Sequence, residues 1–421
     1  MSGVVHVVGT GLAGLSTAVR LTARGQAVRI YEAAPFAGGR CRTFHDPRLS
    51  RDVDNGNHLV LSGNTSANAY LRAIGAEEKM ITLPEAAFPF FDAGTGARWR
   101  VAMNDGAIPW WVSQPSRRVP GTRLWDYLRS ARLAWAGAGQ TVAEAVTDRG
   151  PLWQRFWEPM TWAVLNTTPD RGAASLLWRV LAETFAKGGA RCRPMLAPSG
   201  LGTALVDPAV EHLARHGVEI AFGRALKGVT NGADRIEALH FADGDTVSVA
   251  SEDRVVLALP PTRLKAALPW IDVPDDDSAI LNAHFVVDDP ALAKAPPITG
   301  LVGADTHWIF VKGDVVSLTV SAADRMGLMG EDPQTLAPRL WAETARALNL
   351  AAQPVTWRIN KERRATFDQS PGGVAKRPKA RTAFTNLYLA GDATDTGLPA
   401  TIEGAIRSGE QVAKLASKLA A

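Results

Sequence analysis

The stretch VVHVVGTGLAGLSTAVRLTARGQAVRIYEA, residues 4–33, decides the fold. An apolar run at 5–8 is followed by a tight glycine turn, a helical pattern and a second strand pattern, which together predict a strand–helix–strand unit. Three glycines stand in the spacing G-x-G-x-x-G, at Gly9, Gly11 and Gly14. The first permits the turn, the second lets backbone N–H groups approach a pyrophosphate, and the third lets the helix pack against the strand.

An acidic residue completes this motif. Glu32 ends the second predicted strand, 18 residues after Gly14, where a carboxylate binds a ribose hydroxyl. Because the helix begins at the turn, its N-terminus faces the phosphates with unpaired N–H groups. We therefore predict an α/β fold with a dinucleotide site at this end of the chain. Leu12, Ala13 and Ala33 are also predicted to belong to this site.

A second glycine-rich element, GGRCRTF at residues 38–44, follows soon after Glu32. Its arginines, Arg40 and Arg42, add donors close to the pyrophosphate, which suits a cofactor that lies extended through the domain. Together with the opening stretch, this element resembles the FAD-dependent amine oxidases and phytoene desaturases. The resemblance implies FAD as the cofactor, with Gly39 and Arg40 among its contacts, and a Rossmann-like FAD-binding domain of the glutathione reductase type.

The chain closes with NLYLAGDATDTGLPATIEGAIRSG, residues 386–409. A strand pattern stops at the Gly-Asp pair, and a helical pattern begins near Pro399, which loses nothing in a first turn because its N–H would be unpaired there. By resemblance, the acid holds the ribityl-phosphate region and the helix N-terminus faces the flavin ring, where it stabilises the negative charge of reduced flavin. The cofactor residues implied here are Gly391, Asp392, Pro399, Ala400, Thr401 and Ile402.

Cofactor contacts at both ends imply that the middle of the chain is inserted into one folding unit. We predict a FAD-binding domain formed by 1–64, 193–269 and 378–421. An α+β substrate domain, formed by 65–192 and 270–377, is inserted into it. The family resemblance also places the backbone around Leu226 beside the adenine.

Composition excludes several other classes of protein. The 421 residues are 46% hydrophobic and 21% charged, which is typical of a globular chain. Two cysteines without Cys/His spacing indicate neither a disulfide framework nor a metal site. The net charge is +4, and the basic residues are scattered along the chain instead of forming a cluster, so we expect no nucleic-acid partner. Apolar runs too short for a signal peptide or a spanning helix predict a cytoplasmic, soluble or peripheral protein.

Nine of the 13 tryptophans fall between residues 99 and 178. Trp153 and Trp157 stand four residues apart on one predicted helix face, which fits either core packing or an aromatic channel for a long hydrocarbon. Residues 108–137 hold five arginines and one acid. Aromatic and basic side chains together favour an interfacial membrane contact, and a solvated basic helix is the alternative. The predicted contact, at the inner face of the cytoplasmic membrane, is formed by Trp110, Trp111, Arg117 and Arg118.

The stretch DVDNGNHLVLSGNTSANAYLRAIGA, residues 52–76, narrows the resemblance. Its D-x-G-x-H arrangement, the segment ERRATF at 362–367 and the closing segment resemble the hydroxysqualene dehydroxylases of the hopanoid pathway. Ala393 departs from that pattern, in which a tryptophan is expected. The resemblance implies a hydrophobic isoprenoid substrate and reductive removal of an allylic hydroxyl from hydroxysqualene, which gives squalene.

Loss of the hydroxyl requires a proton donor close to the leaving oxygen. Asp54 is the first candidate and His58 the second, followed by Glu403 and Asp395. A histidine that binds the backbone near the flavin is the alternative for His58, and a pairing with Arg407, four residues on, is the alternative for Glu403.

Two other function classes fit the same fold. An oxidative isoprenoid desaturase or an amine oxidase would pass hydride to FAD instead of receiving it. A non-catalytic isoprenoid carrier would bind lipid without flavin, and the intact glycine and Gly-Asp motifs argue against it.

Overall fold

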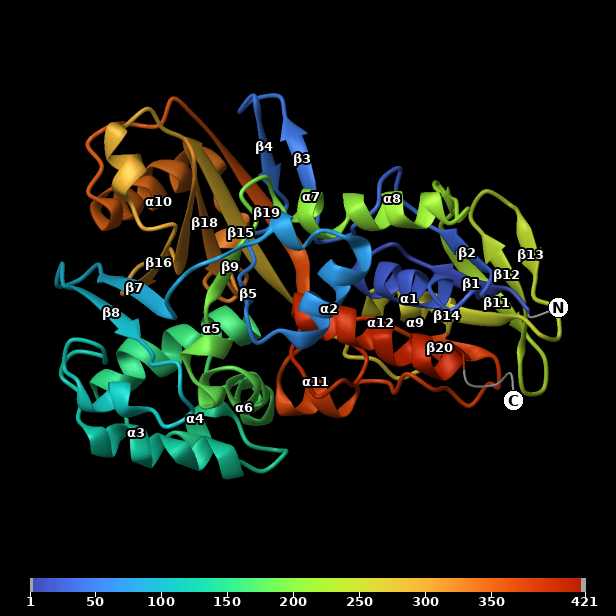
Figure 1. The fold of residues 1–421 in the computed structure, drawn as a ribbon, viewed down its shortest axis with the longest axis horizontal. Helices are drawn as coiled ribbons and strands as arrows, with labels where there is room; N and C mark the ends of the chain where they lie inside the picture. The colour runs from blue at the N-terminus through green and yellow to red at the C-terminus, as the bar shows by residue number, and fades with distance from the viewer. Residues whose placement is uncertain (1–2, 418–421) are drawn as a thin grey trace.

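The computed structural model describes residues 3–417 and brings strands from both ends of the chain into one parallel sheet. Its strand order is β10-β2-β1-β14-β20. In Figure 1 this sheet lies on the right, where the blue start and the red end of the chain meet. The strands are β1 (Val5–Val8), β2 (Val28–Tyr31), β10 (Ile220–Ala221), β14 (Arg254–Leu257) and β20 (Leu387–Leu389). The predicted α/β fold is confirmed.

Both faces of this sheet are buried. Val7 and Tyr388 pack into a core with α1 (Leu12–Thr22) and α12 (Ile402–Ser417). Val8 and Leu389 point the other way, into a core with an antiparallel three-stranded sheet. Because successive residues of a strand face opposite sides, a sheet covered on both faces needs continuous apolar strands. The second core includes β11 (Leu226–Asn231), β12 (Ile236–Phe241), β13 (Thr246–Ser248) and α9 (Pro261–Ala267).

The close approach of α1 to β1 depends on glycine. A Cβ at Gly14, in the first turn of α1, would lie 1.9 Å from the carbonyl oxygen of Gly9. Gly9 itself has a φ of +102°, a conformation that side chains disfavour. The predicted roles of these two glycines, helix packing and turn formation, follow directly from this geometry.

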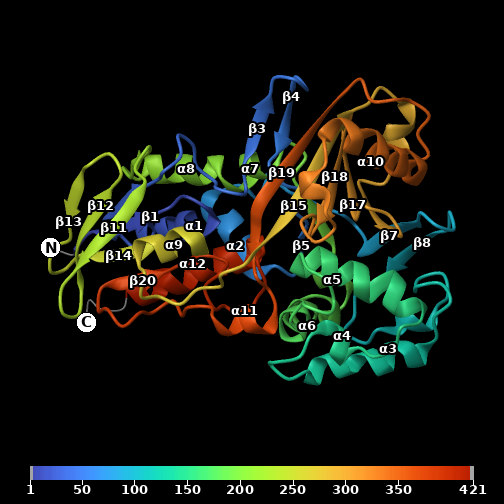
Figure 2. The same cartoon turned by 180° about the vertical axis from the view of Figure 1, so that it is seen from behind.

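A second sheet, with seven strands in the order β19-β15-β18-β17-β16-β7-β8, lies on the opposite side of the molecule (Figure 1). Helix α10 (Pro333–Leu348) packs on one of its faces, where Trp341 contacts Phe285. The strands are β7 (Ala87–Asp92), β8 (Arg98–Ala102), β15 (Asp277–Val286), β16 (Ile298–Val302), β17 (Trp308–Lys312), β18 (Val315–Ser321) and β19 (Thr356–Phe367). Figure 2 shows the long strand β19 running from this sheet back towards the parallel sheet.

A helical lobe packs beneath the seven-stranded sheet and holds most of the tryptophans. Trp111, Trp153 and Trp157 are buried in its core, whereas Trp125 and Trp135 are exposed. Core packing therefore accounts for the pair Trp153 and Trp157. The lobe consists of η2 (Trp110–Ser113), α3 (Leu124–Ser130), η3 (Ala131–Trp135), α4 (Val142–Ala145), the π-helical turn η4 (Trp153–Trp157), α5 (Glu158–Leu165) and α6 (Ala174–Glu183).

Shorter elements connect the two sheets. The short strands are β3 (Thr43–Asp46), β4 (Arg51–Asp54), β5 (Val60–Leu61), β6 (Ile81–Thr82) and β9 (Pro194–Leu196). The remaining α-helices are α2 (Thr65–Ile74), α7 (Leu201–Leu205), α8 (Asp207–Arg215) and α11 (Pro371–Ala375).

In residues 3–417, no helix combines the length and the apolar composition that a bilayer span requires.

Candidate active site

Two glycine-rich turns lie side by side at the carboxyl end of β1. Gly11 and Gly38 form an isolated parallel bridge, and the N–H of Gly38 donates to the carbonyl of Thr10 at 2.9 Å. Gly39 lies against Gly11, and a Cβ added at Gly11 would meet no atom within 4 Å. Helix α1 begins at Leu12, directly after this open space. Bare backbone at a helix N-terminus fits a pyrophosphate, so these residues fit the phosphate end of FAD.

Glu32 lies at the carboxyl end of β2, beside this turn. Its Oε2 accepts the N–H of Thr10 at 2.8 Å, and its Oε1 accepts the N–H of Ala34 at 2.9 Å. The N–H of Arg224 donates to the carbonyl of Glu32 at 2.7 Å, which brings the start of β11 at Leu226 close to the acid. The structure thus brings together the residues predicted for the adenosine end. Of the other predicted cofactor residues, Ala13 and Ile402 are buried and Ala33 is exposed.

An ion pair joins the two ends of the chain. Nη2 of Arg40 lies 2.7 Å from Oδ1 of Asp392, and Nη1 donates to the carbonyl of Ala365 in β19 at 2.6 Å. The Asp392 carboxylate raises the pKa of Arg40. Gly391, with a φ of +140°, donates its N–H to Ser408 in α12 at 3.0 Å. The turn after β20 is therefore held against both the second glycine element and the last helix.

Arg42 does not lie where the sequence analysis expects it. Its guanidinium carbon lies 4.3 Å from the ring centroid of Phe36 and 5.0 Å from that of Phe44. Attraction between a cation and the faces of aromatic rings holds this side chain in a hollow lined by α8 instead of at the pyrophosphate. The predicted donor at the cofactor is thus Arg40 alone.

Helix α12 begins at Ile402, three residues after the predicted start at Pro399. Thr401 terminates the preceding loop because its Oγ1 accepts the N–H of Gly404 at 3.0 Å, as an N-cap side chain does. Pro399 therefore precedes the cap instead of occupying the first turn. Among residues 3–417, the N–H groups of Ile402 and Glu403 have no backbone partner. These two donors are the ones that the helix can offer to an anion.

Asp54 is buried, and three donors contact its carboxyl group. Its Oδ1 accepts the hydroxyl of Thr43 at 2.6 Å and the N–H of Leu201 at 2.8 Å. Its Oδ2 lies 2.6 Å from Nζ of Lys312, the last residue of β17. Donors therefore already occupy both oxygens of this side chain. The catalytic role predicted for Asp54 stays a prediction, and these contacts favour a role in positioning.

His58 is influenced by the charges of two ion pairs, Asp54 with Lys312 and Asp392 with Arg40. Burial lowers the pKa of this half-buried imidazole. The charges of Asp54 and Asp392 raise the pKa, whereas those of Lys312 and Arg40 lower it. The catalytic role predicted for His58 stays a prediction.

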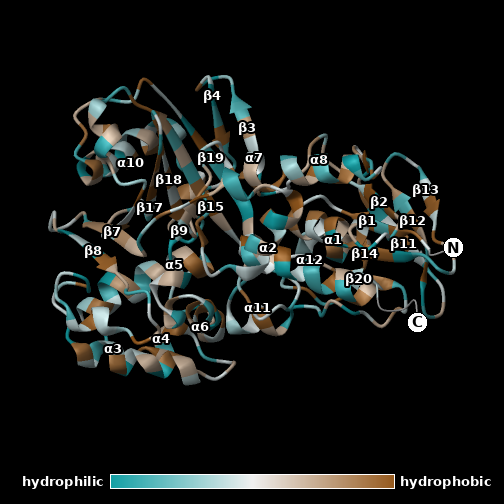
Figure 3. Ribbon diagram, viewed as in Figure 1, coloured by the Kyte–Doolittle hydropathy of each residue, from teal (hydrophilic) through white to brown (hydrophobic). Residues whose placement is uncertain are grey.

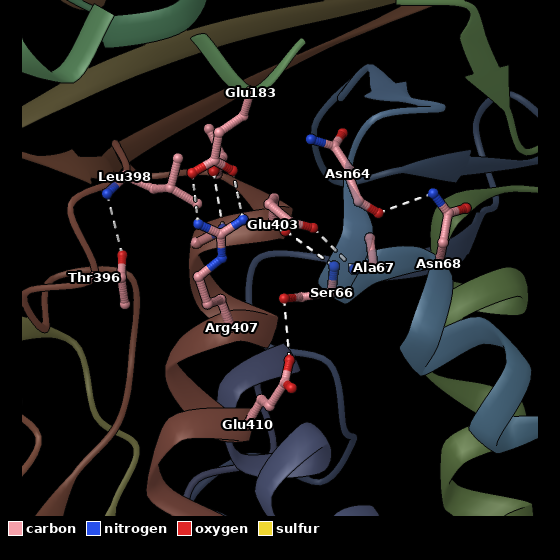
Figure 4. Close-up of polar contacts among 12 residues, drawn as sticks. Asn64, Ser66, Ala67, Asn68, Glu183, Thr396, Leu398, Glu403, Arg407 and Glu410 are labelled. Atoms are coloured by element: carbon pink, nitrogen blue, oxygen red, sulfur yellow. Dashed lines mark hydrogen bonds and ion pairs between the residues drawn. The ribbon is translucent and has the colours of Figure 1, made fainter. Parts of the chain in front are cut away.

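Glu403 has a different environment from the one a proton donor needs. Its two oxygens accept the N–H groups of Ser66 and Ala67, at 3.0 and 2.9 Å, at the start of α2 (Figure 4). Nη2 of Arg407 donates to its Oε1 at 2.7 Å and to Glu183 at 2.6 Å. The predicted pairing with Arg407 is present. Because donors occupy both oxygens of this buried side chain, we interpret Glu403 as a cap of a neighbouring helix, and its predicted catalytic role stays a prediction.

Three side chains near these groups are absent from the sequence-based prediction. Lys312 pairs with Asp54, Arg377 donates to the carbonyl of Asp392 at 2.9 Å, and Gln369 accepts the N–H of Ala400 at 2.8 Å. No motif surrounds them, and each acts on a segment that is distant in the chain. The fourth acid that the sequence suggested, Asp395, is exposed on the loop before α12, where its Oδ1 accepts the N–H of Gly397.

Comparison with known proteins agrees with this arrangement. A solved structure of a putrescine oxidase double mutant superposes with a TM-score of 0.72 at 15% identity, covering 98% of each chain. The hydroxysqualene dehydroxylase of Rhodopseudomonas palustris is 41% identical over 99% of this chain and 98% of its own. That of Sinorhizobium fredii is 42% identical over 98% of each. The family model described as flavin containing amine oxidoreductase matches residues 12–416, and this chain belongs to that family.

Proposed function

We propose that this FAD-dependent oxidoreductase removes the allylic hydroxyl of hydroxysqualene reductively and so forms squalene in hopanoid biosynthesis. The observation that carries the proposal is full-length similarity, at 40–42% identity, to relatives named for this reaction. Fold alone would leave the substrate open, because one fold serves many reactions.

The reaction exchanges a C–O bond for a C–H bond. The hydroxyl leaves as water after it receives a proton, and the allylic carbon receives a hydride. Bound FAD in its reduced form supplies the hydride. Over the whole reaction, the alcohol and reduced FAD give the hydrocarbon, water and oxidised FAD, so atoms and electrons balance. The protein must hold the cofactor, exclude water and deliver the proton.

The residues that would hold FAD belong to the FAD-binding unit, which we take as 1–64, 193–269 and 378–421. The open backbone at Gly11 would receive the pyrophosphate, and Glu32 would bind the ribose. The carboxylate of Asp392 would hold the ribityl region, and the start of α12 would offer its N–H donors to the ring. The substrate unit, 65–192 and 270–377, supplies Lys312 to this site.

We assign proton delivery to His58, with the pair of Asp54 and Lys312 as positioning residues. The imidazole lies within the influence of both ion pairs, and its lowered pKa makes its protonated form a stronger acid than free imidazole. From sequence alone, Asp54 is the first candidate for the proton donor. We propose a positioning role for it instead, because three donors contact its carboxyl group.

The substrate also suggests where the protein works. A long hydrocarbon resides in lipid, so a cytoplasmic enzyme that reaches it must contact the inner face of the cytoplasmic membrane. The basic and aromatic composition of residues 108–137 supports this peripheral location.

The decisive experiment is anaerobic incubation of the purified flavoprotein with chemically reduced FAD and detergent-dispersed hydroxysqualene. We expect squalene and oxidised flavin in equal amounts, measured by mass spectrometry and by flavin absorbance. The same incubation with oxidised FAD and squalene tests the reverse direction. Flavin oxidation without squalene, in the absence of oxygen, would exclude this function.

A further inference from the structure

Exposed apolar side chains are concentrated on one part of the helical lobe. Of the eleven large hydrophobic side chains exposed in the described residues, six lie within residues 108–135. Soluble monomers rarely expose contiguous apolar patches unless these bind something. The six are Ile108 (79% exposed), Trp110 (47%), Leu124 (44%), Trp125 (68%), Leu128 (52%) and Trp135 (80%).

Helix α3 presents its share of these residues on one face. Leu124, Trp125 and Leu128 stand at positions i, i+1 and i+4, which span an arc of about 100° on a helix. Ser130, on the opposite side of the same helix, is buried, and its hydroxyl accepts the indole N–H of Trp157 at 2.9 Å. Helix α3 contacts η2 and η3, which carry Trp110 and Trp135. We call Ile108, Trp110, Leu124, Trp125, Leu128 and Trp135 the outer face.

The charge around the outer face is positive. Arg123, Arg129 and Arg132 are exposed and form no ion pair within residues 3–417. The single acid of the segment, Asp126, accepts the N–H of Arg123 at 2.7 Å and so caps α3. A helix with apolar residues in the middle and arginines beside them has the composition of a helix that lies in the membrane interface. Figure 3 shows hydrophobic and hydrophilic residues alternating along α3 at the lower edge of the molecule.

Three of the four residues that the sequence analysis proposed for a membrane contact serve the lobe itself. Trp111 is buried, 8% exposed, and the guanidinium of Arg117 donates to the carbonyls of Ala102 and Met103 at 2.9 and 3.0 Å. Arg118 likewise donates to a backbone carbonyl, that of Val112. Only Trp110 of the original four residues has an exposed side chain, so the contact moves to α3 and η3.

We propose that the outer face, with Arg123, Arg129 and Arg132, docks the protein on an anionic lipid bilayer with α3 lying in the interface. Tryptophan and leucine enter the boundary between headgroups and acyl chains, and arginine side chains bind the lipid phosphates. The positive charge distinguishes this occupant from a neutral apolar partner, because it adds attraction only to an anionic surface.

A groove beside this face points towards the cofactor region. It has a volume of about 520 Å³ and opens between η3, α6 and the loop before α12. Leu133 and Ala136 line its membrane side, and Trp178 lines its wall. The loop of Asp395–Gly397, which leads into α12, lines the other end. A molecule that leaves the bilayer at η3 therefore meets a partly apolar groove that adjoins the flavin-facing helix.

This proposal rests on the proposed function only for the identity of the substrate, and sedimentation tests it separately. Vesicles of phosphatidylcholine alone and with added phosphatidylglycerol are spun with the full-length flavoprotein. We compare the parent chain with an apolar variant (Trp125→Ser, Leu128→Ser and Trp135→Ser) and a charge variant (Arg123→Gln, Arg129→Gln and Arg132→Gln). The control combines Trp270→Ser and Val355→Ser, which alter exposed side chains elsewhere.

We expect the parent chain and the control to sediment with the anionic vesicles. The apolar variant should bind both kinds of vesicle at least about tenfold more weakly. The charge variant should lose about fivefold per arginine for anionic vesicles, together with the salt dependence of binding. Flavin content and turnover of detergent-dispersed substrate should stay at the parent level, which shows that the variants fold.

Several outcomes overturn the proposal. One is a parent chain that anionic vesicles do not pull down above the vesicle-free background, which is the result expected of a surface that binds a protein. Another is an apolar variant that sediments like the parent. Absence of dehydroxylation in detergent by the parent chain contradicts the proposed function alone and leaves the sedimentation result valid.

Discussion

The guanidinium of Arg407 binds both carboxylate oxygens of Glu183, with nitrogen–oxygen distances of 2.9 and 2.6 Å. Arg407 belongs to α12 and Glu183 ends α6, so the pair joins the last helix to the helical lobe (Figure 4). The same guanidinium holds Glu403, which caps α2. One arginine thus connects three helices around the cofactor region.

Replacing this arginine should cost stability. We expect Arg407→Met to lower the free energy of unfolding by about 2–4 kcal/mol, because two largely buried carboxylates lose their partner. Urea unfolding of the flavin-free protein measures the change. The matched control is Lys414→Met, on the same helix, whose exposed pairing with Glu410 is worth about 0–1 kcal/mol. Equal losses for both variants would contradict the assigned role of Arg407.

Substitutions at two glycines of one motif should separate cofactor binding from folding. Gly11→Val places its side chain in open space, so the chain should fold but bind no FAD, because the branched side chain occupies the pyrophosphate site. Gly14→Val would collide with the carbonyl of Gly9 and should fail to fold. Flavin absorbance and circular dichroism report the two effects. A Gly11→Val protein that purifies with full flavin would refute the cofactor site.

Proton delivery by His58 predicts a specific pH dependence. The rate should fall as pH rises through the pKa of the imidazole, which burial places below its usual value. Asp54→Asn removes a charge that raises this pKa, so the falling limb of the pH–rate profile should move to lower pH. Lys312→Met removes a charge that lowers it, so the limb should move to higher pH.

The variant His58→Gln should retain FAD and lose roughly 10²–10⁴-fold in turnover. Its rate should also no longer fall as pH rises through the pKa of the imidazole. Rates of squalene formation under anaerobic conditions across the pH range measure all three variants. Shifts of the limb in the same direction for both charge variants would assign it to another group.

The half-buried His307 predicts loss of stability in acid. Burial lowers the pKa of His307 to about 4, and its Nδ1 accepts the N–H of Ser321 at 3.0 Å. Because the folded state binds its proton more weakly, this contribution to stability is present above the unfolded pKa and is lost as pH falls towards the folded value. The loss amounts to about 3 kcal/mol.

The variant His307→Gln keeps an acceptor for Ser321 and removes the titration. Its free energy of unfolding, measured in urea at about pH 7 and about pH 4.5, should change less than that of the parent chain. An identical pH dependence in the two proteins would show that other groups cause the acid sensitivity.

Local patterns in the sequence predicted the strands, turns and helices to which the proposed cofactor residues belong. The spacing of Gly9, Gly11 and Gly14, the acid at Glu32 and the Gly-Asp turn after a strand all act within one or two adjacent elements. Such motifs are readable because turn geometry and helix packing depend on neighbours in the chain. The family resemblance, and the pathway that it implied, rested on the same short segments.

Tertiary contacts decided which chemical groups meet. Arg40 pairs with Asp392 across 352 residues and Lys312 with Asp54 across 258, and no local pattern records either pairing. The second contact occupies the Asp54 carboxyl group, and for this reason we propose His58 as the proton donor.

By itself, the sequence determined an α/β fold with FAD as the cofactor, since apolar strand runs and glycine spacing act locally. The tertiary structure decided the start of α12, where the Thr401 cap excludes Pro399 from the helix, and the exposure of the aromatic residues. Trp111 and Trp125 are the same residue type in one basic segment, yet one is buried and the other is 68% exposed. Burial depends on what packs against a side chain, and that is set by segments distant in sequence.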